Sequence, residues 1–281
     1  MKLEMINYKL KWRSKMAIKK IGLLSLFISL FSGCIQLKTE KDEFSKSYEV
    51  KEGIELNVTN KNGKIEIEAW ENNFVEVKAV KSTNHGIEEF QKVEIDVQVG
   101  NEMNIETKYL EKIAKVSVNY EIKVPKDLLV NRITTSNGKI IITGTKGNPT
   151  LKTSNGKIIV DNVDGYVSAK TSNGRIEITN VLGVLEANTS NGRIIAEIPE
   201  IINDELDIST SNGSIELFIP SKLNINIEAI TSNGKIKLNE IEVITSEMSS
   251  KYLKGRIGNG GKKLSVTTSN GNITFNKLVR H

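Results

Sequence analysis

The sequence predicts an all-β protein, a parallel β-solenoid built from two-strand rungs of about 18–21 residues with a β-rich capping region before them. The main observation is the tetrapeptide Thr-Ser-Asn-Gly, which occurs seven times in 281 residues, beginning at Thr135, Thr153, Thr171, Thr189, Thr210, Thr231 and Thr268. Successive copies are 18, 18, 18, 21, 21 and 37 residues apart. The runs between the copies are rich in Ile, Val, Leu and Thr and are too short for helices, which favours strands.

Residues 1–33 are predicted to be a signal peptide. They carry seven basic residues and one acidic residue, a net charge of +6 against +5 for the whole chain, so the rest sums to −1. A near-neutral body gives no support to nucleic-acid binding. The apolar core at residues 21–31 is short for a bilayer span but typical of a signal peptide. A second start at Met16 would give a more compact signal sequence.

Cys34 is the predicted lipidation site. It follows Phe31-Ser-Gly, which resembles a bacterial lipobox, although the usual Leu is replaced by Phe31. The resemblance implies that Cys34 is diacylated and becomes the mature N-terminus; the alternative is a lone buried cysteine behind an ordinary signal peptide. It is the only cysteine, so no disulfide can form within one chain. Residues 34–47 are charged and polar and are predicted to be a lipidated tether.

Residues 48–130 are predicted to be a β-rich capping region. They contain an echo of the repeat at Asn60-Lys-Asn-Gly63. We expect strands at 53–58, 64–70, 75–80, 93–99, 103–107 and 116–124, and one helical turn at 86–91. Such a cap would cover backbone groups that the first rung leaves unpaired.

Residues 131–278 are predicted to be the repeat solenoid. Asn-Gly tolerates positive φ and is a strong turn signal, so the structural turn residues are predicted to be Asn137, Gly138, Asn155, Gly156, Asn173, Gly174, Asn191, Gly192, Asn212, Gly213, Asn233, Gly234, Asn270 and Gly271. Period-two alternation on either side of each turn places Ile, Val, Leu and Ala on one face, with the motif Thr. We expect the Thr methyl to pack in the core while its hydroxyl bonds to the neighbouring turn.

The residue after each motif Gly forms a candidate anionic-ligand edge, which is basic at Lys139, Lys157, Arg175, Arg193 and Lys235. Stacked like charges cost stability unless acids or an anionic ligand offset them. Glu177, Glu197 and Glu216 are close enough in sequence to do so. The alternative is a solvated edge that blocks aggregation between sheets.

No catalytic constellation is predicted, and neither a metal nor a cofactor. The two histidines, His85 and His281, cannot be combined with other residues into a zinc cluster or a nucleophilic triad. Calcium-binding β-rolls need Asp where these turns carry Lys or Arg. The Gly-rich stretch within residues 242–261 lacks the Lys-Ser/Thr of a phosphate loop, so a bulged insertion is expected there. Outward positions such as Ile141, Ile159 and Ile195 are too apolar for a sugar-cleaving cleft.

The Thr-Ser-Asn-Gly repeats, preceded by Val-Asn-Tyr-Glu-Ile-Lys-Val-Pro125, resemble the bacterial putative-adhesin family known as domain of unknown function 4097. The resemblance covers residues 50–278 and implies an envelope β-solenoid without established catalytic residues. We therefore expect a non-catalytic, membrane-anchored lipoprotein for binding or adhesion, facing the periplasm or the cell exterior. One alternative is an envelope-stress accessory that binds cell-wall polymer or a membrane partner through the outward isoleucines; another is a polysaccharide-processing enzyme. The expected partners are the membrane, through the lipid on Cys34, and a surface glycan, cell-wall polymer or envelope protein.

Overall fold

A computed structural model describes residues 38–279, which belong to one compact unit. The predicted all-β solenoid is confirmed, and the described residues include a single helical segment, the 3-10 helix η1 (Ile87–Lys92). Seven strands come before the repeats: β1 (Glu40–Glu49), β2 (Glu55–Thr59), β3 (Ile65–Trp70), β4 (Phe74–Thr83), β5 (Val93–Val99), β6 (Glu102–Tyr109) and β7 (Ser117–Pro125). Each of these strands after β1, and the helical turn, falls within a few residues of its predicted range.

The repeat region supplies the other fourteen strands. They are β8 (Leu129–Thr134), β9 (Ile140–Thr143), β10 (Thr150–Lys152), β11 (Ile158–Asn173), β12 (Ile176–Asn191), β13 (Ile194–Glu197), β14 (Glu205–Asn212), β15 (Ile215–Ile219), β16 (Ile225–Asn233), β17 (Ile236–Asn239), β18 (Ile244–Met248), β19 (Tyr252–Ile257), β20 (Lys262–Asn270) and β21 (Ile273–Lys277). β11 and β12 are each one long strand that runs from one Thr-Ser-Asn-Gly turn to the next. They are continuous because the irregular stretch in the middle of each strand still pairs with the neighbouring strand.

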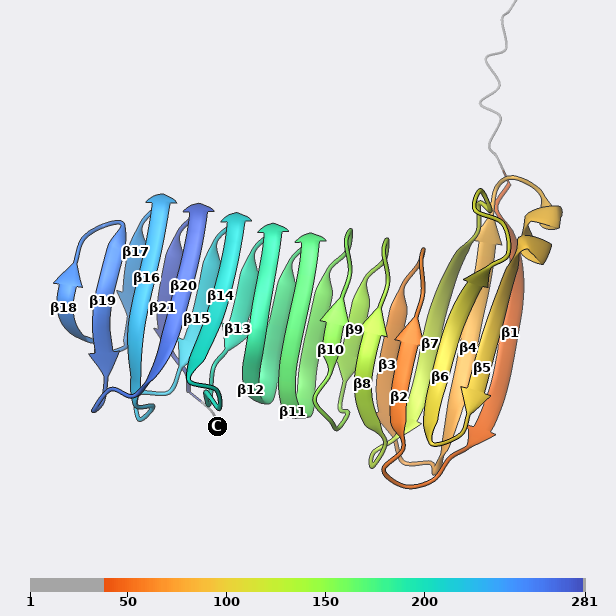
Figure 1. Cartoon of the computed structure of the whole chain (residues 1–281), viewed down its shortest axis with the longest axis horizontal. Coiled ribbons are helices and arrows are strands. Elements are labelled where there is room, and N and C mark those ends of the chain that lie inside the picture. The colour runs from red at the N-terminus through yellow and green to blue at the C-terminus, as the bar shows by residue number, and fades with distance from the viewer. Residues whose placement is uncertain (1–37, 280–281) are drawn as a thin grey trace, which may run out of the picture. The chain divides into compact units, whose positions relative to one another are not determined.

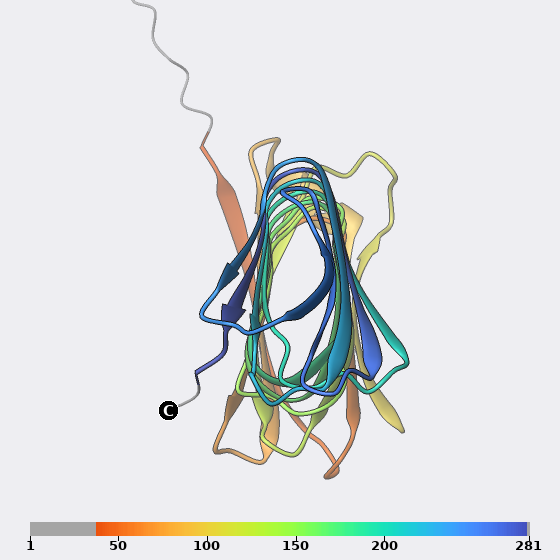
Figure 2. The ribbon, with the colours of Figure 1, turned by 90° about the vertical axis from the view of Figure 1, so that its left-hand side faces the viewer.

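Each rung contributes one strand to each of two faces, which enclose the core (Figures 1 and 2). The approach sheet holds the strands that lead into the motif, in the spatial order β5, β6, β2, β8, β10, β11, β12, β14, β20, β16, β19 and β18. The exit sheet holds those that leave it, in the order β1, β4, β7, β3, β9, β11, β12, β13, β15, β21 and β17.

The core is a narrow column of aliphatic side chains between the two sheets. In the exit strands the buried pairs run from Ile140 and Ile142 to Ile273 and Phe275, and in the approach strands the matching positions include Ile133, Leu151 and Ile208. Each is at most 1% exposed. Alternation therefore identifies the inside correctly, because successive side chains of a strand point to opposite faces. At the outermost rung Leu238 is only partly buried.

The rungs are not stacked in chain order at the C-terminal end. β20 lies between β14 and β16, and β21 lies between β15 and β17. The rung that begins at Thr268 is thus inserted inside the earlier rung of Thr231. The predicted bulged insertion at residues 242–261 is instead the antiparallel hairpin β18–β19, which pairs with the outer strand β16. Its residues carry the chain around the outer rung and back.

The N-terminal end has the same kind of inversion. The β2–β3 rung, which carries the echo Asn60–Gly63, lies between the β6–β7 rung and the first Thr-Ser-Asn-Gly rung. Strands β4, β1 and β5 then close this end in antiparallel orientation. The Tyr120 hydroxyl from the exit sheet lies 2.7 Å from Thr107 Oγ1 of the approach sheet, and burial raises the pKa of Tyr120 to about 12.

The predicted tether at residues 34–47 is wrong for residues 40–47. These residues form most of β1, which pairs with β4 over its whole length, from Glu40 opposite Thr83 to Glu49 opposite Phe74. Charged residues dominate the outer side of this edge strand, while Phe44 and Tyr48 pack against the core. Its composition therefore looks like that of a linker. Residues 34–37, the signal peptide and Cys34 lie outside the described residues.

Candidate functional site

The repeated motif builds a column of turns along one edge of the rung stack. Each Thr is at most 7% exposed, and its Oγ1 donates to the Gly carbonyl of the spatially preceding rung. For Thr153, Thr171, Thr189 and Thr210 this distance is 3.1 Å. The expectation that the Thr hydroxyl bonds to a neighbouring turn is therefore confirmed.

The motif glycines are required by close approach rather than by a left-handed backbone. Gly138, Gly156 and Gly174 do not have positive φ, whereas Gly63 of the echo does, at 122°. A Cβ added at Gly156 would collide with the carbonyl oxygen of Gly138, and the same holds for each following rung. The argument from positive φ is thus wrong for these turns. The absent side chain lets one rung's backbone lie directly on the next.

The motif asparagines form a continuous ladder of side-chain amides. From Asn137 onward, each Nδ2 donates to the Oδ1 of the asparagine on the spatially preceding rung, at 2.7–2.9 Å over seven bonds. In spatial order the ladder is Asn62, Asn137, Asn155, Asn173, Asn191, Asn212, Asn270 and Asn233. All the amides point the same way, so their hydrogen bonds reinforce one another. The predicted turn residues thus hold the stack together.

The candidate anionic-ligand edge lies beside these turns, on the exit sheet, and part of its charge is neutralised. Lys157 Nζ lies 3.5 Å from Glu177, Arg175 also pairs with Glu177, and Arg193 pairs with Glu216. Glu197 instead accepts from the backbone N–H of Asn180 at 3.0 Å. Lys139 and Lys235 form no ion pair within the described residues.

The register also extends this edge to a residue that the motif search missed. Lys64 lies opposite Lys139, since Ile65 pairs with Ile140. Its Nζ lies 2.5 Å from Glu66 and 3.3 Å from Glu121, and the hydrogen bond that it donates to Glu66 raises the pKa of Lys64. Only the echo Asn60-Lys-Asn-Gly63 could have revealed this position in the sequence.

The outward column next to the edge contains both acids and isoleucines. From the N-terminal side it runs Glu66, Ile141, Ile159, Glu177, Ile195 and Glu216. Lys139 and Lys157 therefore lie on two adjacent rungs whose outward residue is an isoleucine, and Arg193 lies on a third such rung, that of Ile195. The two lysines lie beside two partly buried isoleucines, Ile141 and Ile159, whereas Lys235 lies on the outermost rung.

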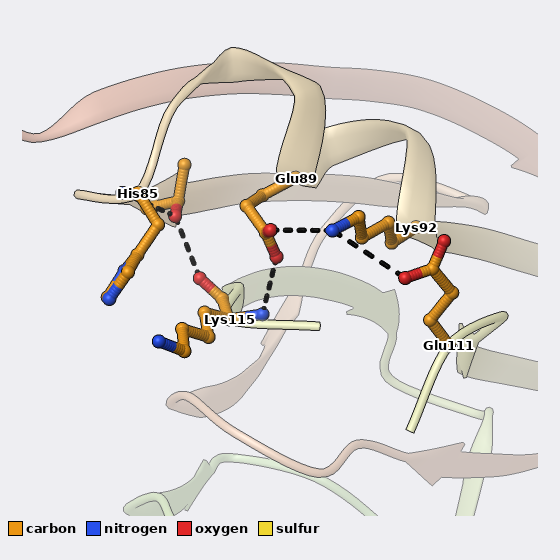
Figure 3. Close-up of polar contacts among 6 residues, drawn as sticks. His85, Glu89, Lys92, Glu111 and Lys115 are labelled. Atoms are coloured by element: carbon orange, nitrogen blue, oxygen red, sulfur yellow. Dashed lines mark hydrogen bonds and ion pairs between the residues drawn. The ribbon is translucent and has the colours of Figure 1, made fainter. Parts of the chain in front are cut away.

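A second polar cluster joins η1 to the β6–β7 loop (Figure 3). Glu89, which is 8% exposed, accepts from the backbone N–H of Lys115 at 2.8 Å and from Lys92 Nζ at 2.7 Å. Lys92 also lies 3.5 Å from Glu111. These donors, the Lys115 N–H first, lower the pKa of Glu89. The arrangement is an ionic clamp, and sequence reasoning did not find it because its partners are 26 residues apart.

His85 takes part in this cluster through its backbone N–H, which lies 3.2 Å from Thr83 Oγ1. The described residues contain no group of three or more His, Cys, Asp or Glu side chains that could hold a metal ion. Among the same residues, no helix has the length and apolar character needed to cross a membrane. Cys34 and His281 lie outside the described residues.

Comparison with known proteins identifies a family for this chain. The model of the Toastrack DUF4097 family matches residues 25–276. No curated protein matches the chain.

Several solved structures resemble this chain at low sequence identity. A putative adhesin from Bacteroides fragilis is 14% identical, with a TM-score of 0.41, and the match covers 84% of this chain and 97% of that one. A putative lipid binding protein from Parabacteroides distasonis is also 14% identical, with a TM-score of 0.39, and the match covers 85% of this chain and 97% of that one. A putative cell adhesion protein from Clostridium sporogenes is 14% identical as well, with a TM-score of 0.35, and the match covers 85% of this chain and 100% of that one.

Proposed function

The chain belongs to the Toastrack DUF4097 family, and from this premise we propose that it is a non-catalytic, lipid-anchored protein of the bacterial cell envelope that binds a partner through its solenoid surface. The observation that carries the proposal is a long, rigid stack of rungs behind a predicted signal peptide and lipobox. A regular stack offers extended edges and faces for binding, but few places where catalytic groups can converge.

The lipid anchor is tested at Cys34. Cys34→Ala removes the only thiol of the chain, so the protein is expected to move from the membrane fraction to the soluble fraction. Cys34→Ser is the matched variant, since it also removes the thiol while keeping a polar side chain. If both variants stay in the membrane fraction to the same extent as the unaltered chain, the lipoprotein proposal is wrong.

For the ligand, the edge supports an anionic polymer of the cell surface, such as teichoic acid, lipopolysaccharide or an acidic glycan. The ion pairs reduce the candidate ligand-binding cations from five to three, and two of these three lie on adjacent rungs. Arg175 and Arg193 are held by Glu177 and Glu216, while Lys157 has only a 3.5 Å contact and Lys139 and Lys235 form no ion pair within the described residues. Lys139 and Lys157 lie on adjacent rungs, whereas Lys235 lies on the outermost rung. The proposed binding strip is therefore centred on Lys139 and Lys157.

The strip is tested by changing its two central lysines together. Lys139→Ser with Lys157→Ser should lower binding to whole cells and to an anionic glycan array. The matched control is Lys152→Ser with Lys170→Ser, which removes the same charge from the approach sheet. Equal loss in both double variants would mean that net charge matters and the strip does not.

An envelope accessory that binds a membrane partner through the outward isoleucines has less support. Ile141 and Ile159 are adjacent, but Glu66 and Glu177 flank them on either side. A partner covering these isoleucines would also have to accommodate or pair with the two carboxylates. Ile141→Ser with Ile159→Ser tests this alternative in the same binding screen.

A further inference from the structure

The most exposed aliphatic side chains gather at one corner of the N-terminal cap. Ile113, Ile87 and Leu110 are 76%, 67% and 62% exposed, higher values than for any other large hydrophobic residue described. Ile87 begins η1, and the other two lie in the loop between β6 and β7. Leaving three such side chains in water is unfavourable, and exposed apolar clusters commonly mark a contact surface.

The ionic clamp holds these two segments together. The Leu110 N–H donates to the Lys92 carbonyl at 2.8 Å, and Lys92 Nζ bridges Glu89 of η1 and Glu111 of the loop. The backbone N–H of Lys115 closes the arrangement on Glu89. Figure 3 shows the contacts of Glu89 with Lys92 and with the Lys115 backbone, and of Lys92 with Glu111. These contacts therefore hold η1 and the β6–β7 loop, which carry the three apolar side chains, in a fixed arrangement.

The chain enters the described structure at this same corner. Glu40, the first residue of β1, pairs with Thr83, four residues before Ile87. Cys34 precedes Lys38 by only four residues, and four extended residues span at most about 14 Å. An acyl chain on Cys34 would therefore keep Lys38, where the described structure begins, within about 14 Å of the bilayer surface.

The charges of the corner suit a lipid surface. The carboxylates of Glu89 and Glu111 are paired through Lys92, which lowers the cost of bringing them near lipid. Lys112 and Lys115 are exposed beside the apolar residues, where cations meet the phosphates of lipid headgroups. Glu88 is the one exposed carboxylate on this part of η1.

We propose that this corner docks on the bilayer that holds the anchor, with Ile87, Leu110 and Ile113 in the headgroup boundary and Lys112 and Lys115 at the phosphates. Amphipathic surfaces enter this boundary by about 5–10 Å, and they reinforce a lipid anchor. The inference rests on the proposed anchor at Cys34. It fixes which end of the rung stack faces the membrane: the cap faces the lipid, and the β18–β19 hairpin faces away.

The test uses one introduced cysteine in the lipidated full chain. Ile113→Cys carries an environment-sensitive fluorophore, and Ile244→Cys, 54% exposed in the far hairpin, is the matched control. Both are measured in vesicles of phosphatidylethanolamine and phosphatidylglycerol with brominated acyl chains. We expect bromine quenching at position 113 to exceed that at 244 by about threefold or more, since only a probe in the boundary meets the acyl chains.

A second variant checks the apolar contact. Ile87→Ser with Leu110→Ser, in the labelled Ile113→Cys chain, changes only exposed side chains and should reduce the lipid quenching. Equal quenching at 113 and 244 in membrane-bound protein overturns the docking. Shielding of position 113 from both iodide and brominated lipid also overturns it, because the corner is then covered by protein.

Failure of the anchor gives a different result. A lipidated Cys34 has no free thiol, so the parent chain without an introduced cysteine should take up no fluorophore. If the parent chain is labelled, the anchor proposal fails before the docking is tested. If the parent is unlabelled and membrane-bound, the quenching decides the docking alone.

Discussion

The middle of the rung stack and its two ends solve the same packing problem in different ways. In the middle, from Thr135 to Asn191, chain order is spatial order and every rung repeats the same Thr, Asn and Gly contacts. At each end the rung that comes first or last in the sequence is not the outermost rung of the stack: β2–β3 lies inside β6–β7, and β20–β21 lies inside β16–β17. Antiparallel strands then close both ends of the stack. The repeated motif forms the parallel rungs, whereas segments without the motif form the antiparallel strands that end the stack.

The largest expected effect comes from breaking a turn in the middle. Gly174→Ala places a Cβ against the Gly156 carbonyl, and the rigid backbone on both rungs cannot move aside. We expect a loss of about 3 kcal/mol or more in the free energy of unfolding. Gly100→Ala is the control in the cap, where no atom lies within 4 Å of the added Cβ. Urea denaturation of both variants measures the contrast, and equal losses would contradict the close-approach argument.

A smaller effect is expected from two buried threonines that differ in their partners. Thr171 Oγ1 donates to Gly156, whereas Thr145 Oγ1, also buried, has no hydrogen-bond partner among residues 38–279. Thr171→Val should cost about 1 kcal/mol, because the Gly156 carbonyl loses its donor. Thr145→Val should be neutral or stabilising by up to about 1 kcal/mol. Val163 and Val181 already occupy the equivalent positions 18 and 36 residues further on.

The thermal midpoints of these two variants provide the check. Thr145→Val should melt at or above the temperature of the parent chain, and Thr171→Val below it. A stabilising Thr171→Val would mean that the Thr column contributes packing and no hydrogen bond.

The asparagine ladder should give a still smaller contrast between middle and end. Asn173 makes two amide bonds at 2.8 Å, to Asn155 and from Asn191, while Asn233 at the outer rung makes one at 2.9 Å. Both side chains are exposed, so each bond is worth about 0.5 kcal/mol. Asn173→Ala should therefore lower the free energy of unfolding roughly twice as much as Asn233→Ala in the same denaturation assay. Equal losses would mean that the number of ladder bonds does not determine the loss.

The cap differs from the middle in its response to pH. The ladder and Thr contacts do not titrate, but the pKa of Glu89 is lowered from its ordinary 4.5 by the Lys115 N–H and Lys92. A carboxyl whose folded pKa is depressed stabilises the fold above its unfolded pKa, and this contribution is lost as pH falls through the folded value. The stability difference between the parent chain and Glu89→Gln should therefore shrink below about pH 4.5. A difference that stays constant from neutral to acidic pH would rule out this role.

Much of the middle was predictable because one rung predicts the next. Period-two alternation identified Ile140 and Ile142 as buried, and the spacing located every turn. The ends were less predictable, since nothing in residues 40–47 distinguishes a charged edge strand from a linker except its pairing with β4. The insertion of the Thr268 rung beside β14 depends on contacts 58 residues apart in the chain, such as Asn270 to Asn212. Local patterns carry no information about that distance.

The candidate site was predicted in the same uneven way. The basic edge was predictable from the residue that follows each motif Gly. Its neutralisation was not, because it depends on the stacking that places Glu177 beside both Arg175 and Lys157. Lys64 joined the edge only through the register of β3 and β9. The exposed corner of Ile87, Leu110 and Ile113 could not be found from alternation, because these residues lie in a helical turn and a loop.

The inverted rungs at both ends also limit how this architecture can change length over generations. A copy of the repeat duplicated within residues 135–191 would slide between identical neighbours and meet the same contacts on both sides. A copy added after residue 277 would emerge in the interior, where β21 already has a partner on each side, and would have no open edge to join. We therefore expect relatives to gain or lose rungs by duplication in the middle while both ends keep their rung order.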